Sequence, residues 1–232
     1  MAAEFSKTQV DQLGHRLRGG SRKDDDLIRL DAYRRSFREP YERVVQLIRN
    51  ELHLDPTGRP AKSTSSVIEK LNRESIRLSQ MQDIAGCRIV VEDVLTQDQV
   101  VTSLGIAFPG SSIVDRRLQP SYGYRAVHVI PKVFGKPIEI QVRSSLQHLW
   151  AELSEKMSDF DPTIKYGGGG QAIRNLLTDT SRAVAGYETR EMVMYSGQTR
   201  PQDQQGLERD KEMLRKAFDG ILSVLDNARK NR

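Results

Sequence analysis

Hydrophobic and polar residues alternate without interruption over residues 138–144, in the segment IEIQVRS. Successive side chains of an extended strand point to opposite faces, so the aliphatic residues share one face and the polar residues the other. The polar face carries Glu139, Gln141 and Arg143. Segments 81–93 and 121–130 also place polar side chains on otherwise apolar strands. Three such strands predict the floor of one binding site.

Apolar residues recur at helical spacing through much of the remaining chain. The pattern predicts helices near 26–54 (in two pieces or kinked at Pro40), 63–73, 96–104, 145–157, 171–194 and 207–230. It predicts strands at 84–91, 112–117, 125–133 and 138–143. This mixed order indicates an α/β (α+β) fold, with a mixed, largely antiparallel sheet of about five strands flanked by helices. The apolar stripes of the last two helices pack either on their own sheet or on a second subunit of a homo-oligomer.

Composition narrows the class of protein. The 232 residues carry a net charge of +5 and a single cysteine, so an intrachain disulfide is excluded. The four histidines are scattered and give no zinc-binding spacing. No apolar run is long enough to cross a bilayer, and the N-terminus lacks the apolar core of a secretory signal. We expect a cytoplasmic protein without a membrane partner. The basic charge favours a polyanionic partner, either a nucleotide or RNA.

Four blocks appear in the order GRPAKSTSSVIEKL, DIAGCRIVV, GYRAVH and IEIQVRSSLQHLWAELSEK, within about residues 58–157. In order and spacing they resemble the RelA/SpoT-type alarmone synthetases. The resemblance implies a nucleotidyltransferase-like fold and transfer of the β,γ-pyrophosphate of ATP to the 3′-hydroxyl of GDP or GTP, giving (p)ppGpp and AMP. No histidine precedes an aspartate, so the His-Asp pair of the family's hydrolase domain is absent. We expect a small synthetase-only member, with a basic polar arm or short helix at 1–25, a catalytic domain at 26–165 and C-terminal helices at 166–232.

Pyrophosphoryl transfer requires an activated hydroxyl and stabilisation of phosphate charge, commonly by a metal. The resemblance singles out two carboxylates for this chemistry. It makes Asp83 a Mg²⁺ ligand and Glu139 a second ligand or the base for the attacking hydroxyl. Mg²⁺ is preferred because it binds hard oxygen ligands together with substrate phosphates. The alternative interpretation of each carboxylate is a solvated residue at the start or edge of a strand.

The resemblance also implies an ATP site made of cationic and hydroxyl side chains. Its residues are Arg59, Lys62, Ser66, Lys70 and Arg88. Arg59 and Arg88 would stack on adenine and bind its phosphates. The family spaces the first arginine and the serine one residue more closely than this chain does. Arg59 is therefore the weakest of these assignments, and a solvated loop arginine is its alternative.

The remaining polar residues of the predicted strands are expected to bind the acceptor substrate. The resemblance implies stacking of the acceptor base on Tyr124 and a contact from His128, and the expected acceptor residues also include Gln141 and Arg143. The family's lysine ahead of the Gly-Tyr pair, which meets the acceptor's 5′-phosphates, is missing here. Arg116 and Arg117 are the candidates to replace it.

This departure keeps a second function open. Some small relatives are toxins that place pyrophosphate on the 3′ CCA end of tRNA, and such a toxin would have an antitoxin protein as its partner. For that function the phosphate contacts would come from the basic termini, Arg16, Arg18, Arg22, Lys23, Arg229, Lys230 and Arg232. An adenine nucleotide is a related acceptor. The presence of both carboxylates disfavours a third interpretation, a non-catalytic nucleotide-binding or protein-binding domain.

Overall fold

The computed structural model describes residues 5–18, 22–196 and 201–230 of the chain. Its α-helices are α1 (Lys7–Arg18), α2 (Asp24–Arg35), α3 (Arg38–Leu52), α4 (Thr64–Arg73), α5 (Val94–Ala107), α6 (Ser145–Ser158), α7 (Gln171–Tyr195) and α8 (Pro201–Lys230). Two short 3₁₀ helices are η1 (Leu78–Gln80) and η2 (Pro162–Tyr166). The strands are β1 (Thr57–Arg59), β2 (Gly86–Val91), β3 (Ser112–Asp115), β4 (Val127–Ile130), β5 (Lys132–Val133), β6 (Lys136–Pro137) and β7 (Glu139–Ser144).

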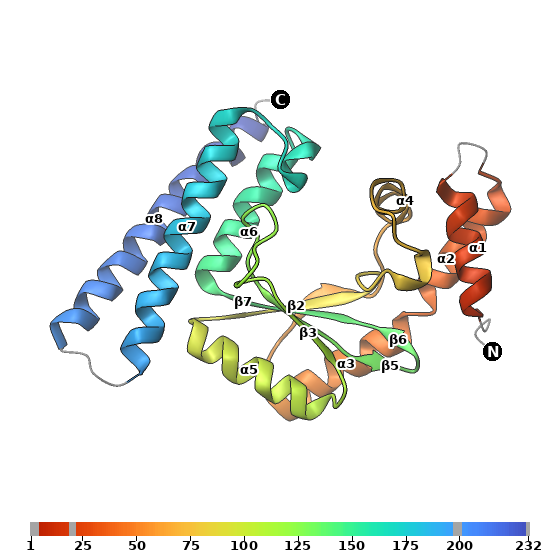
Figure 1. Cartoon of the computed structure of the whole chain (residues 1–232), viewed down its shortest axis with the longest axis horizontal. Coiled ribbons are helices and arrows are strands. Elements are labelled where there is room, and N and C mark those ends of the chain that lie inside the picture. Colours follow the sequence, from red (N-terminus) through yellow and green to blue (C-terminus); the bar gives the residue numbers. More distant parts are fainter. Residues whose placement is uncertain (1–4, 19–21, 197–200, 231–232) are drawn as a thin grey trace. The chain divides into compact units, whose positions relative to one another are not determined.

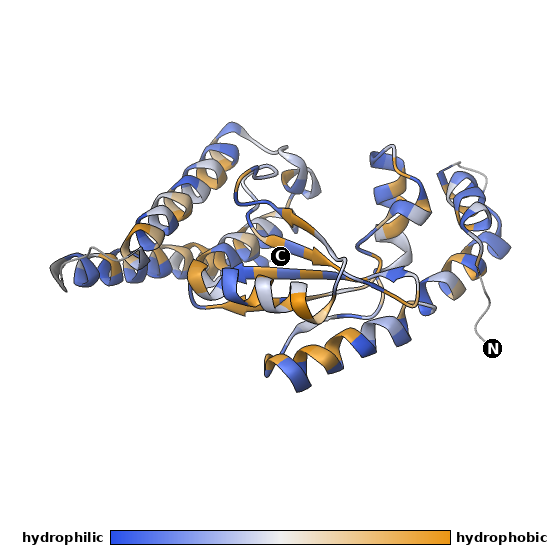
Figure 2. Cartoon of the chain, turned by 60° about the horizontal axis from the view of Figure 1, so that its bottom comes forward, coloured by the Kyte–Doolittle hydropathy of each residue, from blue (hydrophilic) through white to orange (hydrophobic). Residues whose placement is uncertain are grey.

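Five strands form one sheet in the order β1-β2-β7-β4-β3, and β5 pairs with β6 in a separate hairpin. Hydrophobic and hydrophilic residues alternate along the strands (Figure 2). The predicted α+β class and the mixed, largely antiparallel sheet of five strands are confirmed. The expected strand over 125–133 is wrong in its extent, because β4 is only four residues long and Pro131 separates it from β5. Proline lacks the N–H needed to continue a hydrogen-bonded ladder.

The described chain divides into two compact units. The first contains the chain up to Ile89, with Ser103–Ile113 and Val129–Gln141. The second contains Val90–Thr102, Val114–His128 and the chain from Val142 onward. The two units are interleaved in sequence, and the division of the chain into 1–25, 26–165 and 166–232 stays a prediction.

The first unit is built on the N-terminal helices. α1 contacts α2, α4 and η1 (Figure 1). Val10, Leu13 and Leu17 on one face of α1 are buried, so residues 7–18 are a packed helix and not a loose arm. The expected break near Pro40 is confirmed: α2 ends at Arg35, and Pro40 lies in the first turn of α3, where proline is tolerated.

The second unit is centred on the three C-terminal helices, which lie side by side (Figure 1). Their shared core includes Trp150 and Leu153 of α6, Val184 and Tyr187 of α7, and Phe218 of α8. The apolar stripes of α7 and α8 therefore pack on α6 and on each other within one chain. The oligomeric state stays a prediction.

Candidate active site

Asp83 lies in the turn before β2, where two lysines bind its carboxylate. Lys62 Nζ is 2.6 Å from Asp83 Oδ2, and Lys70 Nζ is 2.9 Å from Oδ1. Burial alone would raise the pKa of this carboxyl, but the two ammonium groups outweigh burial and lower the pKa to about 2. Asp83 is therefore ionised at neutral pH, and three of the predicted site residues form one ion-paired cluster, called here the donor cluster.

Local backbone contacts position the donor cluster. The N–H of Lys62 donates to the carbonyl of Ile84, which joins the loop to the residue after Asp83. The hydroxyl of Ser63 caps α4 by accepting from the N–H of Ser66, and it also donates to the Ser66 hydroxyl. Arg34 of α2 donates to the carbonyl of Lys62. Sequence reasoning missed Arg34, because nothing in the pattern of α2 distinguishes it from an exposed helical arginine.

Arg59 and Arg88 come from paired strands. In the antiparallel ladder, Thr57 lies opposite Arg88 and Arg59 lies opposite Gly86. Opposed residues share a face, and so do residues two apart in one strand. Arg59 and Arg88 therefore occupy diagonal positions on the same face of β1 and β2. Arg59 is exposed, and its assignment to ATP stays a prediction.

Glu139 and Gln141 project from β7 as the alternation predicts. Ile138 and Ile140 are fully buried, whereas Glu139 and Gln141 are partly exposed. Gln141 Nε2 donates to Glu139 Oε2 at 2.8 Å. A Cβ on Gly86 would lie 2.6 Å from the carbonyl oxygen of Glu139, so only glycine permits this approach of β2 to β7. β2 begins at Gly86, so Asp83 lies ahead of the strand.

Tyr124, His128 and Arg143 form a second group, called here the acceptor cluster. The Tyr124 hydroxyl is 2.9 Å from His128 Nε2 and accepts from Arg143 Nη2 at 3.1 Å. The Arg143 guanidinium also lies over the Tyr124 ring, 5.0 Å from its centroid, and the His128 ring meets the same ring edge-on. Arg143 is only 3% exposed. Three of the predicted acceptor residues thus come together, with Tyr124 in contact with both His128 and Arg143.

A tight turn delivers Tyr124 to this cluster. Ser121 and Tyr124 exchange backbone hydrogen bonds, with Tyr122 and Gly123 between them at φ of +54° and +92°. Tyr124 therefore precedes β4 and is not one of its residues. A side chain at position 123 would not fit this turn, since a Cβ on Gly123 would lie 2.6 Å from Trp150 Cζ2.

Arg117 is already bound by acidic and amide side chains. Its guanidinium nitrogens lie 2.7 Å from Asp115 Oδ2 and 2.8 Å from Asp98 Oδ1, and it also donates to Gln97. The side chain of Arg116 is exposed, and its backbone N–H donates to Ala126. A phosphate at Arg117 would have to compete with two carboxylates, whereas the side chain of Arg116 is exposed to solvent.

Several basic residues assigned to RNA phosphates have structural partners. Arg18 donates to the carbonyls of Leu71, Glu74 and Ile76, where α4 ends, and it thus satisfies carbonyls left open at a helix terminus. Arg16 pairs with Asp26 at 2.7 Å, and Arg22 donates to a carbonyl of α1. Exposed cations at the termini are Lys23, Lys230 and Arg229, the last paired with Asp159. Arg232 lies outside the described residues.

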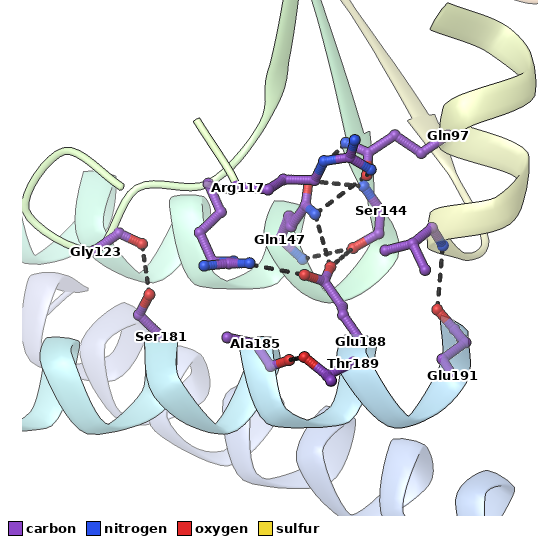
Figure 3. A network of polar contacts seen from close by, with 12 residues as sticks. Gln97, Arg117, Gly123, Ser144, Gln147, Ser181, Ala185, Glu188, Thr189 and Glu191 are labelled. Atoms are coloured by element: carbon purple, nitrogen blue, oxygen red, sulfur yellow. Dashed lines mark hydrogen bonds and ion pairs between the residues drawn. The ribbon is translucent and has the colours of Figure 1, made fainter. Parts of the chain in front are cut away.

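A buried polar network in the second unit was not predicted from the sequence (Figure 3). Glu188 of α7 is 4% exposed, and its Oε1 accepts from Ser144 Oγ and Gln147 Nε2, each at 2.7 Å. Arg125 Nε lies 3.5 Å from the other carboxylate oxygen. The sequence does carry an indication of this network. Leu177 and Val184 mark the apolar stripe of α7 at helical spacing, and the polar residues Ser181 and Glu188 interrupt that stripe.

The arrangement of metal-ligating side chains and the apolarity of the helices bear on metal binding and membrane association. Across residues 5–18, 22–196 and 201–230, no group of three or more His, Cys, Asp or Glu side chains is arranged to hold a metal ion. A Mg²⁺ site of one or two carboxylates completed by substrate phosphates does not require such a group. None of the described helices combines the length and apolarity needed to span a membrane.

Comparison with known proteins supports the resemblance. Residues 58–158 match the family described as a region found in RelA/SpoT proteins. An uncharacterised protein of Mycobacterium tuberculosis is 37% identical over 105 residues, which cover 43% of this chain and 38% of that protein. The chain thus spans well under half the length of the curated relatives it matches.

Solved structures share the fold over a longer stretch. A GTP pyrophosphokinase family protein from Streptococcus pneumoniae aligns with a TM-score of 0.53 and 24% identity, covering 75% of this chain and 93% of that one. Small alarmone synthetase 1 of Bacillus subtilis, bound to its product pppGpp, aligns with a TM-score of 0.52 and 23% identity. The alignment covers 68% of this chain and 93% of that one. Residues 58–158 of this chain thus match the RelA/SpoT region, and the chain shares the fold of the small alarmone synthetases.

Proposed function

We propose that the protein transfers the β,γ-pyrophosphate of ATP to the 3′-hydroxyl of GDP or GTP, producing (p)ppGpp and AMP. The observation that carries this proposal is that the RelA/SpoT region contains every residue of both clusters. A pyrophosphokinase-type transferase is the activity that this region and fold support. That the acceptor is a guanine nucleotide is a further element of the proposal.

The donor cluster suits a triphosphate. Lys62 and Lys70 place two ammonium groups within 3 Å of one carboxylate, and phosphate oxygens are an alternative partner for both. Arg59 and Arg88 add planar guanidinium groups on one strand face, which suit adenine stacking and phosphate binding. Ser66, at the first turn of α4, is an additional hydroxyl for a phosphate oxygen.

The carboxylates fit a magnesium ion. Asp83 is ionised, and carboxylate oxygens are the hard ligands that Mg²⁺ takes alongside phosphates. Asp83 and Glu139 would hold the ion, which would supply neutralisation of the phosphate charge. Each Asp83 oxygen accepts from one lysine here and keeps a second lone pair for the ion, and a phosphate of the donor is an alternative partner for either lysine.

Glu139 is the proposed base. Its carboxylate would accept the proton of the acceptor 3′-hydroxyl, whose oxygen forms the new bond to the β-phosphorus of ATP. The bond between the β-phosphorus and the oxygen bridging to the α-phosphate breaks, and AMP leaves with that oxygen. Gln141, bound to Glu139 at 2.8 Å, orients the carboxylate by donating from its amide.

The acceptor cluster offers a base-stacking ring with two polar neighbours. Tyr124 would stack on the base of the acceptor nucleotide, since any base offers a π-face and stacking has limited selectivity. His128 and Arg143 hold the Tyr124 hydroxyl from two sides. His128 is the proposed contact to the acceptor itself.

A specific observation keeps tRNA as a second candidate acceptor. Arg117 is bound to Asp98 and Asp115, so Arg116 is the candidate with fewer internal partners for a nucleotide's 5′-phosphates. A terminal tRNA adenosine has no free 5′-phosphates and would not need such a cation. The internal partners of Arg16, Arg18 and Arg22 weaken the case for RNA contacts at the N-terminus. A toxin of this kind would also bring an antitoxin partner.

The test is a transfer assay with ATP labelled on its γ-phosphate and Mg²⁺, offering GDP, GTP, AMP, ADP and deacylated tRNA in parallel. Label in GDP or GTP supports the proposal, and label only in tRNA supports the second candidate. A Glu139→Gln preparation serves as the control for contaminating kinases. Absence of transfer to every acceptor, with the protein folded, would overturn both.

A further inference from the structure

α7 lies outside the RelA/SpoT region of residues 58–158, yet it contacts segments on both sides of the acceptor cluster. Its apolar stripe packs on α6, and three polar side chains of the helix are also buried: Ser181, Glu188 and Glu191. Buried polar groups are costly unless they are hydrogen-bonded. The partners of Ser181 and Glu188 therefore indicate what these two residues hold in place.

Ser181 holds the turn before Tyr124. Its hydroxyl donates to the carbonyl of Gly123 at 2.7 Å. The ring of Trp150 packs against the same glycine, and the Trp150 indole N–H donates to Leu177 of α7 at 2.9 Å. The left-handed turn that delivers Tyr124 is thus fastened directly to α7 and α6.

Glu188 holds the residues that follow Tyr124 and Arg143 in sequence. One oxygen accepts from Ser144, the neighbour of Arg143 (Figure 3). The other faces Arg125, the neighbour of Tyr124. One carboxylate therefore joins the backbone segments that carry the two members of the cation–π pair. Gln147 supplies the third contact.

We propose that Glu188 is a positioning residue for the acceptor: through Arg125 and Ser144 it fixes the Tyr124–Arg143 pair in the orientation that stacks on the acceptor base. This inference rests on the proposed function, because it assigns Tyr124 to acceptor binding. Small displacements of a binding group have large effects on catalysis. Loss of the carboxylate charge should therefore weaken acceptor use while ATP use is preserved.

The test compares Glu188→Gln with Glu191→Gln. Glu191 is a matched control, since it lies one turn along the same helix, is 3% exposed and accepts from Val94 N–H and the Tyr187 hydroxyl, outside the acceptor cluster. For Glu188→Gln we expect the acceptor KM to rise about tenfold, with the KM for ATP changed less than about twofold. The Glu191 variant should leave both KM values near wild type. A purely structural role would lower the melting temperature or the active fraction without separating the two KM values.

Ser181→Ala provides a milder second variant, which removes one hydrogen bond to Gly123. We expect it to change the acceptor KM in the same direction and to a smaller extent. Fluorescence of Trp150, the single tryptophan of the chain, reports whether each variant retains the packing of α6 against α7. Equal changes of both KM values in Glu188→Gln, or none, would overturn the inference.

A readout without turnover separates this inference from the proposed function. If wild-type protein transfers to none of the acceptors, the proposed function fails, but amide hydrogen exchange over residues 121–128 still tests the positioning. Faster exchange there in Glu188→Gln than in Glu191→Gln supports the role of Glu188 in holding the Tyr124 turn. Unchanged exchange in this segment would overturn it.

Discussion

Asp83 in the donor cluster and Glu188 beside the acceptor cluster are two carboxylates with little exposure to solvent, but the protein treats them in opposite ways. Asp83 lies between two lysines, and their positive charge lowers its pKa to about 2 despite burial. Glu188 has serine, glutamine and one more distant arginine as partners, and burial raises its pKa above the usual value. Strong charge pairing thus outweighs desolvation at Asp83 but not at Glu188.

This difference suits different tasks. Ion pairs exchange partners when another anion arrives, so Lys62 and Lys70 are suited to release Asp83 and bind phosphate. The Glu188 network has directional hydrogen bonds from fixed elements, among them the capping box at the start of α6. A network of this kind is suited to hold a binding ring in place. We expect the donor cluster to rearrange on binding ATP and the acceptor cluster to stay largely as it is.

The largest expected effect is on the chemical step. Glu139→Gln should lower kcat about a hundredfold to ten-thousandfold, because general acid–base catalysis contributes about 10²–10⁴ in rate. The change is nearly isosteric at a partly exposed position, so circular dichroism and the melting temperature should match wild type. Turnover within tenfold of wild type would remove Glu139 from the role of base.

The donor cluster should also contribute to stability in a pH-dependent way. Asp83 has a pKa lowered from 3.8 to about 2, so its contribution is fully present above about pH 4 and is lost as the pH falls through about 2. We expect it to be worth about 2 kcal/mol of unfolding free energy at neutral pH. Denaturant unfolding of wild type and Asp83→Asn from pH 7 to 2 measures it. The gap between the two proteins should narrow on acidification, and a constant gap would contradict the assignment.

Tyr124→Ala tests the acceptor cluster. Loss of one stacking interaction is worth about 1–3 kcal/mol, which raises the acceptor KM roughly 5- to 150-fold. The KM for ATP should change little, since the donor cluster does not include Tyr124. Tyr124→Phe is the matched control, because it keeps the ring and loses only the hydroxyl bound by His128 and Arg143. A phenylalanine variant as impaired as the alanine variant would show that the hydroxyl matters more than the ring.

The smallest expected effect concerns the acceptor phosphates. Arg116→Ala removes an exposed charge, and an exposed contact of this kind is worth about 0.2–1 kcal/mol. We expect the KM for GTP to rise no more than about fivefold, with no effect on transfer to tRNA. Steady-state kinetics at fixed ionic strength measures the KM for GTP and for tRNA in the variant and in wild type. Equal effects on GTP and tRNA would dismiss Arg116 as a ligand of the nucleotide's 5′-phosphates.

The local pattern of the chain was sufficient to predict individual elements and the chemistry they carry. Alternation predicted which face of β7 bears Glu139 and Gln141, and helical spacing predicted the helix near 63–73, where α4 lies. The order of helices and strands predicted the fold class. These features depend on side-chain periodicity and on backbone hydrogen bonds between near neighbours, which a sequence displays directly.

Tertiary structure alone decided which charges are paired. Nothing near Asp83 in sequence shows that Lys62 and Lys70 meet it, or that Arg117 is bound by Asp98 and Asp115. Likewise, Glu188 reaches Ser144 across 44 positions. The pKa of a carboxyl and the availability of an arginine are set by distance and burial, which depend on packing between remote segments. The sequence by itself therefore determined which strands carry the candidate side chains, and the fold decided which of these side chains are ion-paired or hydrogen-bonded and which are exposed.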